Sequence, residues 1–182
     1  MPSHPVCPVD PDSLRRHVRD IPDFPKPGIL FRDITPLLAD PDGFRSAVEA
    51  MAARAADLAP GLIVAIEARG FILGAALAFR LGCGFVPIRK PGKLPFRTRR
   101  RTYALEYGTD TQEIHEDAVR SGQRVLLVDD VLATGGTLAS AADLVRESGG
   151  TLAGACVLVE LSALGGRTRL PGVDIRSVLV FS

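Results

Sequence analysis

Residues 125–138 read VLLVDDVLATGGTL, and this stretch decides the fold class. An apolar run ends in Asp129 and Asp130, and a turn of small residues then opens a segment with helical periodicity. Strands that are apolar on both faces are typical of a parallel sheet covered by helices. Ligands of such sheets bind at the carboxyl ends of the strands, which is where the acids and the turn are expected.

The turn itself has the composition of a phosphate site. It consists of Ala133, Thr134, Gly135, Gly136 and Thr137, whose lack of bulk lets backbone N–H groups approach a ligand closely. Amides at the start of a helix bind phosphate, and the two threonine hydroxyls can donate further hydrogen bonds. Neither a Walker A loop nor a G-x-G-x-x-G fingerprint is present in the chain.

The two aspartates need a different partner, because a carboxylate repels a phosphate at close range. Ribose hydroxyls donate hydrogen bonds and suit Asp129 and Asp130 well. The alternative is a strand, turn and capped helix without a ligand. Two adjacent acids after an apolar strand are costly to bury without partners, so the binding interpretation is favoured.

Working outward, other short apolar runs alternate with helical segments. Strands are expected at residues 62–66, 84–88, 124–129, 152–160 and 174–180, and helices at 12–18, 41–58, 71–80 and 137–147. This alternation predicts an α/β fold. Glu67, Ala68, Arg69 and Gly70 follow one strand, and Arg89 and Lys90 follow another, so both groups are expected beside the aspartates.

The bulk composition indicates one globular domain spanning residues 1–182, with a loose N-terminus at 1–11. Hydrophobic residues make up 46% and charged residues 24%, which argues against disorder across the chain. The net charge of +1 favours neither nucleic acid nor an anionic membrane. No secretory signal, membrane span or cysteine cluster is recognisable, so a cytoplasmic protein is expected.

A basic segment separates two of the expected strands. Residues 89–102 contain Gly and Pro, many cations and no acid, and are interpreted as a flexible loop that closes over a site. Lys93 is expected to act on a ligand, and several of the arginines to steer anions at long range. Residues 102–107 and 111–115 are expected to form a β-hairpin turned at 108–110.

The 125–138 stretch resembles the phosphoribosyl diphosphate-binding signature of type I phosphoribosyltransferases. Four further segments are similar to adenine phosphoribosyltransferases: FPKPGILFRDITPL at 24–37, EARGF at 67–71, IRKPGKLP at 88–95 and YALEYG at 103–108. The resemblance runs in order from about residue 21 to residue 160. It implies a central, mostly parallel sheet flanked by helices, a small base-binding hood at 21–38, a lid loop and a homodimer.

The same resemblance implies purine salvage, in which adenine and phosphoribosyl diphosphate give AMP and pyrophosphate with Mg²⁺. It places the 5′-phosphate on Ala133, Thr134, Gly135, Gly136 and Thr137, and the ribose hydroxyls on Asp129 and Asp130, directly or through Mg²⁺. It places pyrophosphate on Glu67, Ala68, Arg69, Gly70, Arg89, Lys90 and Lys93, and adenine on Leu30, Phe31 and Arg32. Glu106 would handle the proton of the base, and Tyr103 and Tyr107 would pack on the ligand or seal the site.

Two other functions stay open at this point. A phosphoribosyltransferase could use hypoxanthine, guanine or xanthine, because base choice depends on a few hydrogen bonds in the pocket. A ligand-sensing regulator on the same fold would bind nucleic acid instead of catalysing. The chain has no additional domain or helix-turn-helix pattern to support the regulator.

Overall fold

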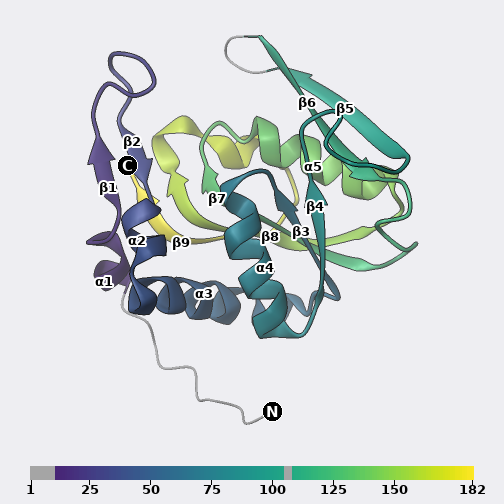
Figure 1. The fold of residues 1–182 in the computed structure, drawn as a ribbon, viewed down its shortest axis with the longest axis horizontal. Coiled ribbons are helices and arrows are strands. Elements are labelled where there is room, and N and C mark those ends of the chain that lie inside the picture. The colour runs from purple at the N-terminus through teal and green to yellow at the C-terminus, as the bar shows by residue number, and fades with distance from the viewer. Residues whose placement is uncertain (1–10, 105–107) are drawn as a thin grey trace.

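The computed structural model describes residues 11–104 and 108–182. Five parallel strands form its central sheet, in the order β4-β3-β7-β8-β9. These strands are β3 (Leu62–Ile66), β4 (Gly84–Ile88), β7 (Arg124–Leu132), β8 (Thr151–Leu161) and β9 (Ile175–Phe181). The predicted α/β fold with a parallel sheet is therefore confirmed (Figure 1).

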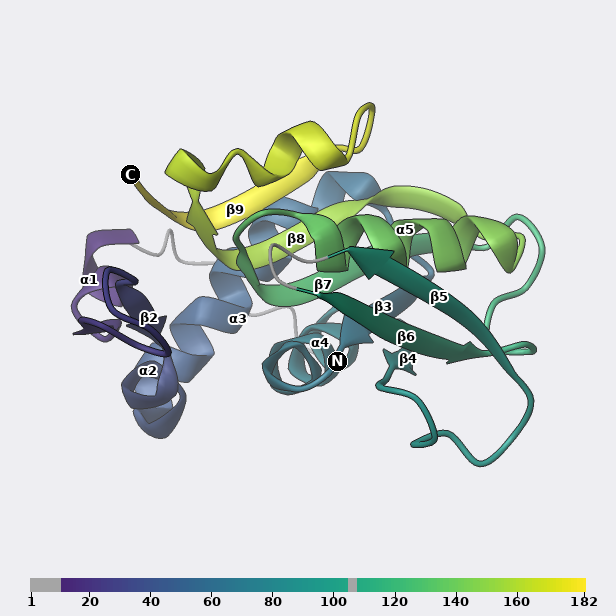
Figure 2. The ribbon, with the colours of Figure 1, turned by 90° about the horizontal axis from the view of Figure 1, so that it is seen from above.

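Helices cover the sheet on both faces, and alternate residues of one strand serve the two faces. Helices α3 (Pro41–Ala55) and α4 (Arg69–Leu81) pack on one face, where Ile63 and Ala65 of β3 join their core. Helix α5 (Gly136–Glu147) packs on the other face with Leu62, Val64 and Ile66. Figure 2 shows this arrangement from above, with α5 in front of the sheet strands. The cover on both faces explains why the strands are apolar throughout.

The strand order places a crevice at the carboxyl ends of β3 and β7. The chain leaves β3 through α4 towards β4 at one edge, and leaves β7 through α5 towards β8 and β9 at the other edge. The loops after β3 and β7 consequently diverge to opposite faces of the sheet. Such a switch point is where open α/β sheets bind ligands.

Two smaller units flank this crevice. At the N-terminal side, α1 (Pro11–Arg15) leads into β1 (Arg19–Ile21), which pairs antiparallel with β2 (Phe31–Asp33) before α2 (Thr35–Ala39). Opposite it, β5 (Thr98–Ala104) and β6 (Thr109–His115) form an antiparallel pair that contacts α5. These are the expected hood region and hairpin (Figures 1 and 2).

The boundaries of the basic loop and of the hairpin differ from those expected from the sequence. Residues 98–102 belong to strand β5, so the predicted loop over 89–102 was wrong in its last part. Thr109 and Asp110, expected in the turn, belong to β6. The physical reason is pairing across the strands, since Arg100 lies opposite Glu113 and Arg101 opposite Gln112 in the register.

No helix in the two described ranges is long and apolar enough to cross a membrane. The predicted cytoplasmic location stays a prediction. Residues 1–10, which include most of the expected loose N-terminus, lie outside the described ranges.

Candidate active site

A cavity of about 490 Å³ lies at the switch point. The hood region, the loop after β3, the end of β4, the hairpin and the carboxyl end of β7 all contribute to its wall. The predicted site residues on this wall are Leu30, Phe31, Arg32, Glu67, Ala68, Arg69, Arg89, Lys90, Tyr103, Asp129, Asp130, Ala133 and Thr137. Residues far apart in the sequence are therefore gathered in one place.

Strand β7 positions the two aspartates. Asp129 and Asp130 are 8% and 5% exposed, because the strand continues to Leu132 and carries both of them inside the fold. Asp129 Oδ1 accepts a hydrogen bond from the Asp130 amide at 2.9 Å. Burial, and then the neighbouring charge of Asp130, raise the pKa of Asp129 well above its ordinary value of 3.8.

Arg69 supplies the compensating charge from the start of α4. Its Nε donates to Asp130 Oδ2 at 2.5 Å, and its guanidinium lies 5.5 Å from the ring centroid of Phe31. Gly70 lets the helix approach this closely, since a Cβ there would lie 2.9 Å from Asp129 Oδ1. Arg69 thus connects the aspartates to the hood. Its predicted pairing with a phosphate stays a prediction.

Glu67 organises the cations at the end of β4. Arg89 donates to its two carboxylate oxygens at 3.2 and 3.3 Å, and the Lys90 amide donates to Oε2 at 2.9 Å. These hydrogen bonds, led by the one from Arg89, hold the pKa of Glu67 below its ordinary value. Glu67 lies at a cis peptide bond with Ala68. The hydrogen bonds to Glu67 hold Arg89 and the Lys90 backbone at the cavity wall.

The small-residue turn leads from β7 into α5 as the sequence predicted. Gly135 is the N-cap residue of α5 and has φ +81°, a conformation that favours glycine. Without a side chain it cannot accept a hydrogen bond from the first-turn amides, which keeps that capping position available to a ligand. Ala133 and Thr137 are the residues of this turn on the cavity wall, on either side of Thr134, Gly135 and Gly136.

The hairpin closes the opposite side of the cavity. The Tyr103 hydroxyl lies 3.2 Å from Thr137 Oγ1 and donates to Asp110 Oδ2 at 3.1 Å. Burial raises the pKa of Tyr103 to about 12, so the phenol stays protonated at neutral pH. Lys90 Nζ also donates to Asp110. Glu106 and Tyr107, the other predicted residues of this hairpin, lie outside the described residues.

The hood contributes an apolar edge with its cations turned elsewhere. Phe31 packs edge-on against Phe24 at 5.2 Å between ring centroids, and Leu30 is largely exposed beside it. The Arg32 side chain pairs with Asp20 and lies over the Phe181 ring at 4.3 Å. Arg32 therefore offers the cavity its backbone and stem rather than its charge.

Two arginines of the basic segment have acidic partners elsewhere in the chain. Arg100 Nε lies 2.5 Å from Glu113 Oε1, and Arg101 lies 2.6 Å from both Asp143 and Glu147 of α5. These acids offset the charge of Arg100 and Arg101. The steering of anions by arginines of this segment stays a prediction. Lys93 and Gly70 do not line the cavity among the described residues. The role predicted for Lys93 stays a prediction.

Sequence reasoning missed several residues of the wall. Asp110 and Gln112 alternate along β6 and face the cavity together, a period-two signal that was available once the strand was placed correctly. The Gln112 side chain is buried, and its Oε1 has no hydrogen-bond partner in the described part of the chain. Ile29, Ile66, Ile88, Val131, Leu161 and Leu164 also line the cavity.

The cavity holds carboxylates but no preformed metal cluster. Within residues 11–104 and 108–182, no group of three or more His, Cys, Asp or Glu side chains could hold a metal ion. Two carboxylates are nevertheless enough for Mg²⁺ that arrives with a substrate, because one or two carboxylates commonly hold that ion together with substrate phosphates. Asp129 and Asp130 fit this requirement.

Comparison with known proteins gives a consistent result. The sequence pattern of the phosphoribosyl transferase domain matches residues 40–174. The chain is 56% identical over 168 residues to an adenine phosphoribosyltransferase of Thermotoga neapolitana, covering 92% of this chain and 99% of the relative.

Solved structures are similar over the same length. An adenine phosphoribosyltransferase from Thermoanaerobacter pseudethanolicus matches with a TM-score of 0.93 and 52% identity, covering 94% of this chain and all of that one. One from Saccharomyces cerevisiae, complexed with an imino-altritol bisphosphate and adenine, matches with a TM-score of 0.89 and 37% identity, covering 93% and 98%.

The burial of Asp129 generates a prediction on stability. A raised pKa means that the folded chain keeps the Asp129 proton to higher pH than the unfolded chain does. Ionisation of Asp129 is therefore less favourable in the folded chain than in the unfolded chain. The free energy of unfolding falls as the pH rises above the ordinary pKa of 3.8. We expect Asp129→Asn to raise the free energy of unfolding at pH 7 and to flatten its pH dependence, as measured by chemical denaturation from pH 5 to 8.

The exposed Asp117 provides the matched control for this experiment. Asp117→Asn should leave both the stability and its pH dependence unchanged. Loss of stability at pH 7 in Asp129→Asn would contradict the electrostatic cost inferred here.

Proposed function

The chain belongs to the phosphoribosyl transferase family, and on this basis we propose that it transfers the phosphoribosyl group of 5-phosphoribosyl 1-diphosphate to adenine, giving AMP and pyrophosphate. The observation that carries the proposal is the meeting of four chemically distinct groups in one cavity of about 490 Å³. These groups are a small-residue turn at a helix start, two carboxylates, a cluster of cations and an apolar aromatic edge. They match, in turn, a phosphate, ribose hydroxyls, pyrophosphate and a purine.

The ribose 5-phosphate binds at the carboxyl end of β7. The 5′-phosphate accepts hydrogen bonds from the turn of Ala133–Thr137, helped by the positive end of α5. The ribose hydroxyls donate to Asp129 and Asp130. Asp129 and Asp130 would hold Mg²⁺ arriving with the substrate, and the ion would supply positive charge beside the diphosphate.

Bond cleavage depends on the cations around Glu67. The bond between the anomeric carbon and pyrophosphate breaks through an oxocarbenium-like transition state, which leaves negative charge on the departing oxygen. Glu67 fixes the Arg89 side chain, and Asp110 holds the Lys90 ammonium. Both cations supply preorganised positive charge to that oxygen. Closing of the segment after Lys90, with Lys93, would exclude the water that competes with the base.

The base completes the reaction from the hood side. Phe31 offers a flat apolar face to adenine, and backbone groups near Leu30 and Arg32 read its edge. A ring nitrogen bonds to the anomeric carbon and loses its proton, for which Glu106 is the proposed acceptor. Tyr103, held against Thr137 and Asp110, closes the cavity beside the sugar.

Adenine is assigned because the relatives described above carry that name, so a different purine and a non-catalytic regulator are not favoured. The assay is direct: protein, Mg²⁺, phosphoribosyl diphosphate and one base at a time. We expect AMP from adenine, little or no nucleotide from hypoxanthine or guanine, and loss of turnover with EDTA. Salt-sensitive RNA binding without consumption of any base would favour the regulator instead.

Glu106→Gln tests the proton transfer. Because the amide cannot accept the proton of the base, we expect kcat to fall roughly 100- to 10,000-fold. The affinity for ribose 5-phosphate, measured by calorimetry, should stay at the unmodified value. Equal losses of turnover and of ribose 5-phosphate binding would remove Glu106 from the proton-transfer step.

A homodimer is the second part of the proposal, and it rests on an apolar patch as well as on the family. Phe79 and Ile72 of α4 are 87% and 46% exposed, and Phe85 of the neighbouring edge strand β4 is 37% exposed. Ile72 and Phe79 are seven residues, about two turns, apart and so lie on the same side of α4. Exposed large apolar side chains of this kind favour association with a partner. We propose that a second copy of the chain covers this patch.

Light scattering after gel filtration tests that interface. The unmodified chain should run at twice 19.4 kDa, and Phe79→Glu, which places a charge in the patch, should shift it towards 19.4 kDa. Val180→Glu at the opposite edge of the sheet is the control and should keep the dimer. A monomeric unmodified chain would overturn the homodimer, and a dimeric Phe79→Glu would overturn this patch as its interface.

A further inference from the structure

The segment after β8 has no role in the function proposed so far. It contains two short 3₁₀ helices, η2 (Ser162–Leu164) and η3 (Gly166–Arg169), and then returns to the edge strand β9. Leu161 and Leu164 line the cavity, and Leu170 is buried in the core beneath α5. The segment therefore lies against the site as well as against the sheet.

Its closest approach is to the turn that holds the proposed phosphate site. A Cβ on Gly135 would lie 2.2 Å from the Gly166 carbonyl oxygen, and a Cβ on Gly166 would lie 2.2 Å from the Ala133 carbonyl oxygen. Neither position can take a side chain without displacing backbone. Two glycines thus bring two backbones into direct contact, and the position of η3 limits where residues 133–135 can lie.

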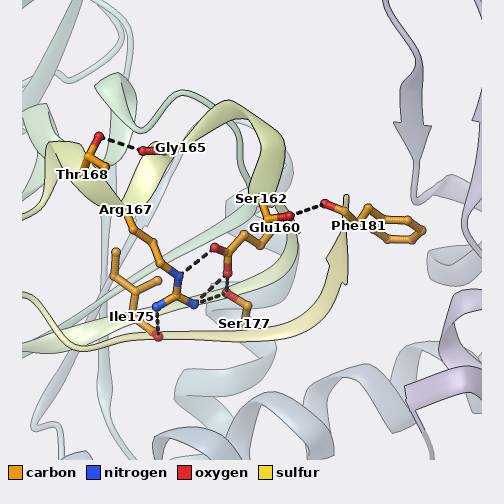
Figure 3. A network of polar contacts seen from close by, with 8 residues as sticks. All are labelled: Glu160, Ser162, Gly165, Arg167, Thr168, Ile175, Ser177 and Phe181. Atoms are coloured by element: carbon orange, nitrogen blue, oxygen red, sulfur yellow. Dashed lines mark hydrogen bonds and ion pairs between the residues drawn. The ribbon is translucent and has the colours of Figure 1, made fainter.

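Arg167, the next residue after Gly166, anchors η3 to the sheet. Its Nε and Nη2 each donate to a different oxygen of Glu160 at 2.7 Å, and its Nη1 donates to the Ile175 carbonyl at 2.9 Å (Figure 3). Ser177 of β9 bonds to both Arg167 and Glu160. The guanidinium therefore joins β8, β9 and η3 in one network.

Glu160 makes this anchor rigid rather than incidental. Its side chain is 7% exposed and lies at the end of β8, the strand beside β7. A two-point bond between guanidinium and carboxylate fixes orientation as well as distance, which a lysine cannot do. The network thus fixes the position of the Gly166 backbone against the Ala133–Thr137 turn.

We propose that Arg167, held by Glu160 and Ser177, is a positioning residue that supports the Ala133–Thr137 turn through Gly166 and sets its affinity for the 5′-phosphate. The link to the 5′-phosphate rests on the proposed function, whereas the mechanical support of the turn does not. Arg167 touches no substrate in this proposal and acts only through the backbone of Gly166.

Replacing Arg167 alone by an uncharged residue would leave the buried carboxylate of Glu160 unpaired and could unfold the chain. The variants are chosen to avoid this. Arg167→Lys keeps the charge but loses the two-point bond, and the double variant Glu160→Gln with Arg167→Gln removes both charges together. The matched control is Arg176→Lys, because Arg176 also bonds to both oxygens of a carboxylate, Asp174, at 2.7 Å, but on the exposed start of β9.

The first measurement is hydrogen exchange of the peptide that covers residues 132–139, without any ligand. We expect faster exchange in Arg167→Lys and in the double variant, and unchanged exchange in Arg176→Lys. Unchanged exchange in both test variants would overturn the support of the turn, whether or not the chain makes AMP.

The second measurement compares two ligands by calorimetry. Ribose 5-phosphate should bind about tenfold more weakly to Arg167→Lys, because the displaced turn would lose roughly one hydrogen bond to the charged 5′-phosphate. The affinity for pyrophosphate should stay unchanged. Equal weakening of both ligands would indicate a general structural effect and would overturn the proposal. Failure of the unmodified chain to bind ribose 5-phosphate would instead count against the proposed function. The hydrogen-exchange result would still show whether Arg167 supports the Ala133–Thr137 turn.

Discussion

The burial of two adjacent carboxylates at the end of the central strand is the constraint around which this molecule is arranged. Asp129 and Asp130 are almost wholly withdrawn from water, so their charge must be offset by groups brought from elsewhere in the chain. Arg69 does this from the start of α4, and Gly70 allows that helix to come close enough. Burial of the two carboxylates therefore has an electrostatic cost, which is seen in the raised pKa of Asp129.

The same principle of paired charges extends around the cavity. Glu67 holds Arg89 and the Lys90 amide, and the Lys90 side chain reaches Asp110 on the hairpin. Each cation is thereby held in place before a substrate arrives, which is what makes electrostatic stabilisation effective. Charges at the site are therefore oriented by one another rather than by solvent.

The glycines of the site serve close contact between backbones. Gly135 combines a positive φ with close packing against Gly166. The conformation of the Ala133–Thr137 turn therefore depends on η3 as well as on β7 and α5. The Glu160–Arg167–Ser177 network connects that contact to β8 and to the edge strand β9. A turn that reads as local in sequence is thus supported by a segment about thirty residues later.

Periodicity and composition were sufficient to predict the parallel sheet, the strands at Leu62–Ile66 and Gly84–Ile88, and the turn at the start of α5, because these depend on local patterns of apolar and small residues. The same patterns placed the two aspartates, the small-residue turn and the groups after β3 and β4 at one edge of the sheet. The family resemblance added Leu30, Phe31 and Arg32 of the hood, Glu106, and the role expected of each residue.

Only the tertiary structure decided what depends on partners distant in the chain. Arg100 and Arg101 read as a mobile basic run, yet Glu113, Asp143 and Glu147 hold them in strand β5 and against α5. Asp110 and Gln112 reach the cavity through the register of the hairpin, and Gly166 reaches the phosphate turn through the return of the chain to β9. Local periodicity shows at most which residues share one face of a strand, as with Asp110 and Gln112. It does not show what that face meets, because this depends on the packing of segments that only the folded chain brings together.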